Sequence, residues 1–216
     1  NVYTSKGWYE PNDTRENLDW LKRTRPSYPE RFNYEVMDSE EKPMAIRLAN
    51  YIKDVYKPET VLDIGCGPGG MVDLAQSKGL ITLGIDGDFE VPRADTLNVL
   101  IHDFTVGPCP IDNRYDLAWS CEFVEHVHAE YISNFMPAFQ QCHYVIMTFA
   151  PPGFPGYHHV NCQEQDYWIN VFDQFGFDFD SASTEQIRTS STMNTSKKPN
   201  KQFVKQRGLF FVNRNW

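Results

Sequence analysis

The chain has 216 residues, of which 41% are hydrophobic and 23% charged, and it carries a net charge of −9 at pH 7. This length allows one domain with a full hydrophobic core. A mean hydropathy of −0.52 and the lack of any apolar run near 18 residues exclude a membrane-spanning protein, while the acidic balance disfavours a large nonspecific nucleic-acid surface.

The N-terminal residues 1–38 are rich in Tyr, Trp, Arg and Pro and show weak periodicity. We expect them to form a cover segment, with residues 39–216 as a single globular domain. The aromatic residues of the cover either line a substrate entrance or pack onto the core. They are Trp8, Tyr9, Trp20, Tyr28, Phe32 and Tyr34. A helix is predicted from Ser39, a suitable N-cap, to about Tyr56.

Strands and helices are predicted to alternate along the rest of the chain. The predicted strands cover residues 60–64, 81–85, 98–102, 115–119, 144–149 and 209–213. The predicted helices cover residues 70–77, 122–135 and 163–174, and a loop-rich region follows the last of these. This alternation predicts an α/β fold with three αβα layers and a doubly wound, mainly parallel sheet. Ligands bind such sheets at the carboxyl ends of the strands.

A glycine turn follows the first of these strands, in the run Gly65-Cys66-Gly67-Pro68-Gly69. Its glycines allow positive φ and a close main-chain approach to a ligand, at the positive end of the next helix. The spacing fits both the Gly-x-Gly-x-x-Gly fingerprint of dinucleotide sites and an Asp-x-Gly-x-Gly-x-Gly pattern of S-adenosylmethionine (SAM) sites. Pro68 removes an N–H that a pyrophosphate would use, and Asp63 is placed to receive a methionine ammonium. SAM is therefore favoured over NAD or FAD.

Further cofactor contacts are expected at the ends of the neighbouring strands. Asp86, followed by Gly87 and Asp88, lies where an acid bonds ribose hydroxyls. Asp103 is expected to accept the adenine amine, with Phe104 or Phe89 against the base, although an Asp that only caps a turn is the alternative. The segment facing the methionine arm contains Ser120 and Cys121.

Polar residues that could perform chemistry follow the strand at 115–119. On a helix, Glu122, Glu125 and His126 would share one face. Such donors suit Mg²⁺, Mn²⁺ or Zn²⁺, and His158 or His159 could complete the site. The alternative is a metal-free polar wall in which Glu125 bonds the backbone and one of these histidines is the general base.

Four segments resemble motifs I to IV of class I SAM-dependent methyltransferases. They are VLDIGCGPGG, GIDGD, HDF and DLAWSCEFVEHV, within residues 60–150. The resemblance implies seven strands, the last antiparallel, and in-line methyl transfer from SAM. The Glu-x-x-Glu-His element is similar to that of metal-dependent O-methyltransferases of ubiquinone biosynthesis and of small-RNA 3′-terminal ribose. If this similarity extends to the matching positions of this chain, the metal ligands would be Glu122, Glu125, His126 and either His158 or His159.

The sequence thus predicts O-methylation of a small metabolite or sugar hydroxyl, by an enzyme without membrane contact. Its five scattered cysteines predict free thiols and a cytoplasmic location. Methylation of RNA or another phosphate-bearing acceptor is the alternative, and a noncatalytic SAM-binding module and a dinucleotide oxidoreductase are further ones. A basic C-terminal stretch supports an anionic acceptor, or is a solvated loop. It contains Arg188, Lys197, Lys198, Lys201, Lys205, Arg207 and Arg214.

Overall fold

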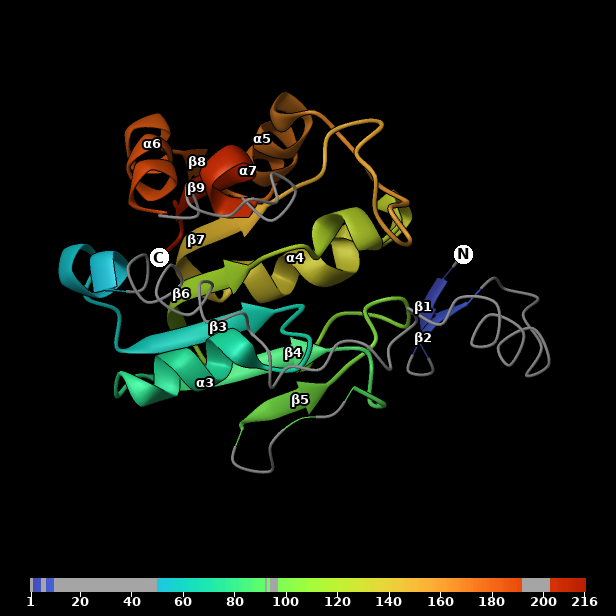
Figure 1. Cartoon of the computed structure of the whole chain (residues 1–216), viewed down its shortest axis with the longest axis horizontal. Coiled ribbons are helices and arrows are strands. Elements are labelled where there is room, and N and C mark those ends of the chain that lie inside the picture. Colours follow the sequence, from blue (N-terminus) through green and yellow to red (C-terminus); the bar gives the residue numbers. More distant parts are fainter. Residues whose placement is uncertain (1, 5–6, 10–49, 92, 94–96, 192–202) are drawn as a thin grey trace.

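The computed structural model describes residues 2–4, 7–9, 50–91, 93, 97–191 and 203–216 (Figure 1). Its main feature is a seven-stranded sheet with the order β5-β4-β3-β6-β7-β9-β8. The strands are β3 (Thr60–Ile64), β4 (Ile81–Asp86), β5 (Val99–Ile101), β6 (Tyr115–Ser120), β7 (Cys142–Thr148), β8 (Phe177–Phe179) and β9 (Gly208–Asn213). The first five strands of this order pair in parallel, whereas β9 runs antiparallel to both β7 and β8. The predicted doubly wound, mainly parallel sheet is confirmed.

Helices cover both faces of the sheet. They are α3 (Gly70–Ser77), α4 (Ile132–Gln140), α5 (Gln165–Gln174), α6 (Ser181–Ser190), α7 (Phe203–Arg207) and the short 3₁₀ helices η2 (Val124–His126) and η3 (Ala129–Tyr131). Side chains alternate along each strand, so Leu117 and Trp119 of β6 pack on the side of α6 and α7, and Ala118 packs on the side of α4 and α5. These are the three layers that the sequence predicts.

Most of the predicted elements agree with the structure. The helix at 70–77 has the predicted bounds, and Gly79 ends it with φ +79°. Residues 50–55 are helical, but the rest of the helix predicted from Ser39 lies outside the described residues. So does the predicted cover, apart from the antiparallel pair β1 (Val2–Thr4) and β2 (Gly7–Tyr9). No helix in the described part of the chain is long and apolar enough to cross a membrane.

The helix predicted over residues 122–135 is wrong. Glu122 has φ +55°, the segment forms η2 and η3, and the α-helix begins only at Ile132. In an α-helix the carbonyl of Glu125 would accept the N–H four residues later. Here it accepts the N–H groups of Val160 and Asn161 instead, at 2.9 and 3.1 Å. A contact with the loop after β7 therefore replaces the helical hydrogen bond.

The loop-rich region predicted after residue 174 is also corrected. It contains the edge strand β8 and the helix α6, whose N-cap is Asp180. The final strand at 209–213 is confirmed as β9, which lies between β7 and β8. The carboxyl ends of the parallel strands β3, β4, β6 and β7 lie along one edge of the sheet (Figure 1), and Gly208 at the start of β9 pairs with Thr148 at the end of β7.

Candidate functional site

The glycine turn after β3 has the conformation that its sequence predicts. Gly65, Gly67 and Gly69 have φ values of +77°, +52° and +84°. The turn is closed by the N–H of Gly69 on the carbonyl of Cys66, at 2.9 Å. A Cβ at Gly65 would lie 2.5 Å from the Phe123 ring, whereas no atom of the described residues lies within 4 Å of a Cβ built at Gly67. The turn is thus packed against the protein at Gly65 and open at Gly67.

A buried carboxylate stands at the base of this turn. Asp63 on β3 is 4% exposed. Burial, and then the charge of Asp86, raise the pKa of Asp63 to about 8. A positively charged ligand group beside it would restore its ionised form, whereas a diphosphate would not.

Asp86 at the end of β4 holds the turn in place. One of its oxygens accepts the N–H of Gly67 at 2.8 Å, and the other accepts the N–H of Asp88 at 2.9 Å and lies 3.0 Å from Arg93. A carboxylate offers about four lone-pair sites, so little capacity remains for ribose hydroxyls. Arg93, which sequence reasoning missed, also donates to the carbonyl of Gly67 at 2.6 Å.

Several residues predicted at the cofactor also make contacts within the protein. Phe104 is 4% exposed and meets Phe123 and Phe135 edge-on in the core, so it cannot lie against a base. Ser120 is 1% exposed and donates to the carbonyl of Ile64, which ties β6 to β3. Asp103 caps its own turn by accepting the N–H of Thr105.

The other predicted cofactor residues are Cys66 and Pro68 of the turn itself and Gly87, Phe89 and Cys121 outside it. Burial raises the pKa of the Cys66 thiol and, further, that of the Cys121 thiol. Both are therefore uncharged thiols. Gly87 is buried, Pro68 is half-buried, and Phe89 is 51% exposed.

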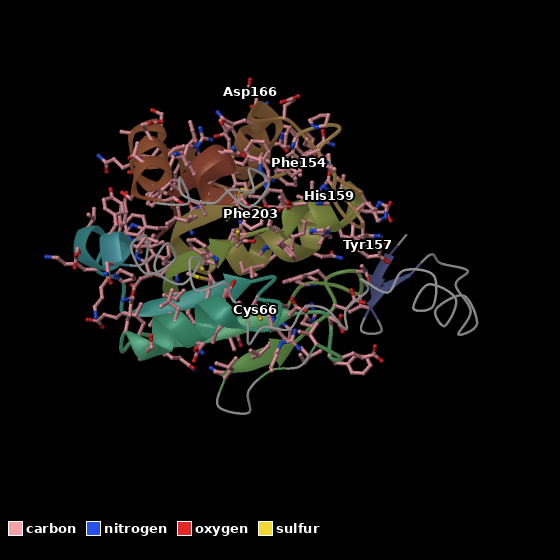
Figure 2. The ribbon with its side chains drawn as sticks, in the orientation of Figure 1. Cys66, Phe154, Tyr157, His159, Asp166 and Phe203 are labelled. Atoms are coloured by element: carbon pink, nitrogen blue, oxygen red, sulfur yellow. The ribbon has the colours of Figure 1, made fainter. Side chains whose placement is uncertain are left out.

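Three of the predicted catalytic residues come together beyond the ends of β6 and β7. Ligand atoms of Glu125, His126 and His159 all lie within 4.8 Å of one another. The two imidazole rings are 4.9 Å apart and nearly perpendicular. His159 comes from the loop after β7, in which Phe154 lies beside it (Figure 2). This cluster, Glu125–His126–His159, is called the donor cluster below.

Each histidine of the donor cluster is oriented by the backbone. His126 Nδ1 lies 3.2 Å from the carbonyl oxygen of His158, and His159 Nδ1 lies 3.1 Å from that of Phe154. Because a carbonyl only accepts, each Nδ1 donates in these contacts. In the neutral imidazole the lone pair is then on Nε2. Histidine ligands of metals are commonly oriented in this way.

The third member of the donor cluster is fully buried. Glu125 is 0% exposed, and neither of its carboxylate oxygens has a hydrogen-bond partner among the described residues. Burial, and then the charge of Glu122, raise its pKa to about 8. Arg207 Nη1 lies 3.9 Å from Glu125 Oε1 and offsets only part of the cost of burying this carboxylate. Without hydrogen bonds, the group is further stabilised by a proton or by a second cation. The donor cluster therefore fits a divalent metal with three protein ligands.

The fourth predicted ligand, Glu122, does not join the donor cluster. Its Oε1 lies 3.1 Å from Arg207 Nη2 and accepts a hydrogen bond from the Thr148 hydroxyl at 3.1 Å. His158, with φ +51°, presents its carbonyl to His126 and packs its ring near His128. Arg207 was read from the sequence only as part of a basic stretch, and nothing in the spacing indicated that it meets Glu122.

Burial weakens two of the candidate bases. It lowers the pKa of His126 to about 3, with a further contribution from His159, and it lowers that of His158 to about 4, with a contribution from His128. Both imidazoles are neutral near pH 7, and both accept a proton less readily than an ordinary histidine.

Solved structures similar to this chain include SAM-dependent methyltransferases. Magnesium protoporphyrin IX methyltransferase from Synechocystis PCC 6803 with bound SAM is 15% identical with a TM-score of 0.54, over 80% of this chain and 78% of that one. A SAM-dependent methyltransferase from Archaeoglobus fulgidus is 18% identical with a TM-score of 0.52, over 79% and 92%. No protein-family model and no curated protein matches the chain. The fold is therefore that of class I SAM-dependent methyltransferases.

Proposed function

We propose that the protein is a SAM-dependent methyltransferase that acts on a hydroxyl of a small metabolite or sugar. The main support for this proposal is the glycine turn. Among the described residues none lies close to a Cβ built at Gly67, and the buried carboxyl of Asp63 lies on the strand that leads into the turn. The buried carboxyl of Asp63 beside the turn favours a cationic ligand over the diphosphate of NAD or FAD. SAM supplies an electrophilic methyl group on a sulfonium.

The chain's own residues would bind the cofactor and deprotonate the acceptor. Main-chain N–H groups at the start of α3 and the carboxylate of Asp63 would hold the amino-acid end of the cofactor. His159 is the proposed general base, because its Nδ1 is held by the carbonyl of Phe154 and its Nε2 can receive the hydroxyl proton. The lowered pKa values of His126 and His158 make these two histidines weaker bases.

A metal-assisted form of the reaction is the second proposal. The buried carboxylate of Glu125 favours it, because neither oxygen has a hydrogen-bond partner in the described part of the chain. In this form Glu125, His126 and His159 would hold Mg²⁺, Mn²⁺ or Zn²⁺. The ion would supply a positive charge that lowers the pKa of an acceptor hydroxyl. The acceptor could then be a ribose 2′-hydroxyl of RNA. The described arginines of the basic stretch do not favour RNA, because Arg188, Arg207 and Arg214 all donate within the protein.

Calorimetry with two matched glycine variants tests cofactor binding. Gly67 and Gly79 both have positive φ, and in the described part of the chain no atom lies within 4 Å of a Cβ built at either, but Gly79 follows the far end of α3. Both alanine variants should lose about 1 kcal/mol of unfolding free energy through the left-handed backbone. Only Gly67→Ala should lose the heat of binding of SAM and of its demethylated product. Wild-type binding of NAD(H) without SAM, or equal SAM binding by both variants, would overturn the proposal.

Detection of demethylated SAM with a panel of hydroxylated metabolites and sugars tests the chemistry. His159→Gln should stop product formation and retain SAM binding. His143→Gln is the control, because His143 stacks on Trp216 outside the site and its loss should leave turnover unchanged. A noncatalytic SAM-binding module would give no product with the wild type.

A further inference from the structure

Arg207, which the sequence predicts only as part of the basic stretch, is a buried cation in the structure. It ends α7, is 5% exposed, and donates to the carbonyl of Phe149 at 2.5 Å. Its guanidinium carbon lies 4.2 Å from the centroid of the Phe154 ring. The same loop then brings the Phe154 ring parallel to that of His159, with centroids 6.2 Å apart. Arg207 thus touches the loop that carries His159.

Arg207 also meets both acidic residues that follow β6. Its Nη2 is 3.1 Å from Glu122 Oε1, and its Nη1 is 3.9 Å from Glu125 Oε1. The shorter contact is the stronger one, and the Thr148 hydroxyl fixes the same Glu122 oxygen. The Oε1 atom of Glu122 is therefore engaged by Arg207 and Thr148, while the oxygens of Glu125 have no hydrogen-bond partner in the described part of the chain.

We infer that Arg207 is a positioning residue that keeps Glu122 out of the donor cluster. The cluster then presents three protein donors to a divalent cation, and the remaining coordination positions stay open for acceptor oxygens. This arrangement is typical of catalytic metal sites, whereas four protein ligands close a site. The inference rests on the metal-assisted form of the proposed function. It departs from the four-ligand set that the sequence predicts.

The test is a titration of the full chain with Co²⁺ alone, followed by the visible spectrum of the bound ion. The double variant Arg207→Met/Glu122→Gln removes the ion pair without changing net charge. It should bind Co²⁺ within about twofold of the wild type and with the same spectrum. Arg207→Met alone frees the Glu122 carboxylate, so it should bind about tenfold tighter and with a changed spectrum, because an added carboxylate raises affinity.

Control variants separate this effect from general damage. Arg214→Met removes an exposed arginine that pairs with Asp173 and Asp178, and it should bind Co²⁺ like the wild type. His159→Gln should lose most of the affinity. If methionine at position 207 prevents folding, Arg207→Lys keeps the charge beside Glu122 and should retain the wild-type affinity and spectrum.

Two results would overturn the inference. One is a large loss of Co²⁺ affinity in the double variant, which would make Glu122 a ligand. The other is the absence of Co²⁺ binding by the wild type. Calorimetry with the demethylated product of SAM, run on the same samples, reports on the proposed function separately. It should show the same affinity in every variant, because Arg207 lies outside the glycine turn.

Discussion

At the scale of single residues, the burial of Asp63 has a consequence for stability. Its pKa is raised from 3.8 to about 8 by burial and then by Asp86. Between about pH 4 and pH 8 the native state therefore holds a proton that the unfolded chain releases. The contribution of Asp63 to the free energy of unfolding is complete below this window and is lost as pH rises to about 8. We expect Asp63→Asn to flatten the fall of stability from pH 5 to pH 8 in urea denaturation.

Asp116 is the control, because its pKa is lowered whereas that of Asp63 is raised. Burial alone would raise its pKa, but the N–H groups of Glu59 and Thr60, at 2.8 and 2.9 Å, and the Thr60 hydroxyl outweigh burial and lower it. The contribution of Asp116 to the free energy of unfolding is present above the pKa of this group in the unfolded chain. It is lost as pH falls through the pKa of the group in the folded protein. Asp116→Asn should therefore leave the fall of the unfolding free energy between pH 5 and pH 8 unchanged. It should alter the pH dependence of stability only at acidic pH, below about 4. An unchanged slope for Asp63→Asn would contradict the assignment to Asp63.

At the scale of elements, the helices α5 and α6 differ in how their N-termini are capped. Asp180 caps α6: one of its oxygens accepts the N–H of Ser183 at 2.9 Å and the other accepts its hydroxyl at 2.8 Å. The N-cap of α5 is Glu164, whose side chain makes no capping bond. Asp180→Ala should cost about 1 kcal/mol of unfolding free energy, and Glu164→Ala much less. Equal losses in thermal unfolding would show that the cap does not stabilise α6.

The elements also show what the sequence can and cannot predict. Strands such as β3 and helices such as α3 follow from apolar runs and from the glycines that end them, which are local signals. The helix predicted after β6 fails because the carbonyl of Glu125 bonds the loop after β7, a contact between distant segments. The same limit applies to the candidate site. Gly67 and Asp63 were predicted from their spacing, whereas the pairing of Glu122 with Arg207 exists only after the sheet places β9 beside β7.

At the scale of the whole molecule, the sheet order explains why separate motifs meet. β3, β4, β6 and β7 run in parallel, so the residues that follow them are gathered along one edge of the sheet. Because β9 is antiparallel, its first residues and the end of α7 return to that same edge. The glycine turn, the donor cluster and Arg207 therefore lie on one side of the protein, although they are far apart in the sequence.

The net negative charge of the molecule favours a small acceptor over RNA. The chain carries −9, and in the described part of its C-terminal stretch three arginines are engaged internally: Arg188 with Gly208, Arg207 with Glu122 and Arg214 with Asp173 and Asp178. Lys197, Lys198 and Lys201 lie outside the described residues. Binding of a phosphate backbone requires basic side chains that can release counterions. The internal pairing of the arginines removes much of that capacity.

We therefore expect weak binding of single-stranded RNA, with a Kd above about 100 µM at 50 mM salt. Fluorescence anisotropy of a labelled 20-nucleotide RNA, titrated with the full chain in the presence of the demethylated product of SAM, measures it. Because few counterions would be released, raising the salt to 200 mM should change the signal little. A Kd in the low micromolar range that weakens steeply with salt would instead favour RNA as the acceptor. Lys197→Glu and Lys198→Glu would then show whether the undescribed lysines bind the backbone, with Arg214→Glu as the control outside that segment.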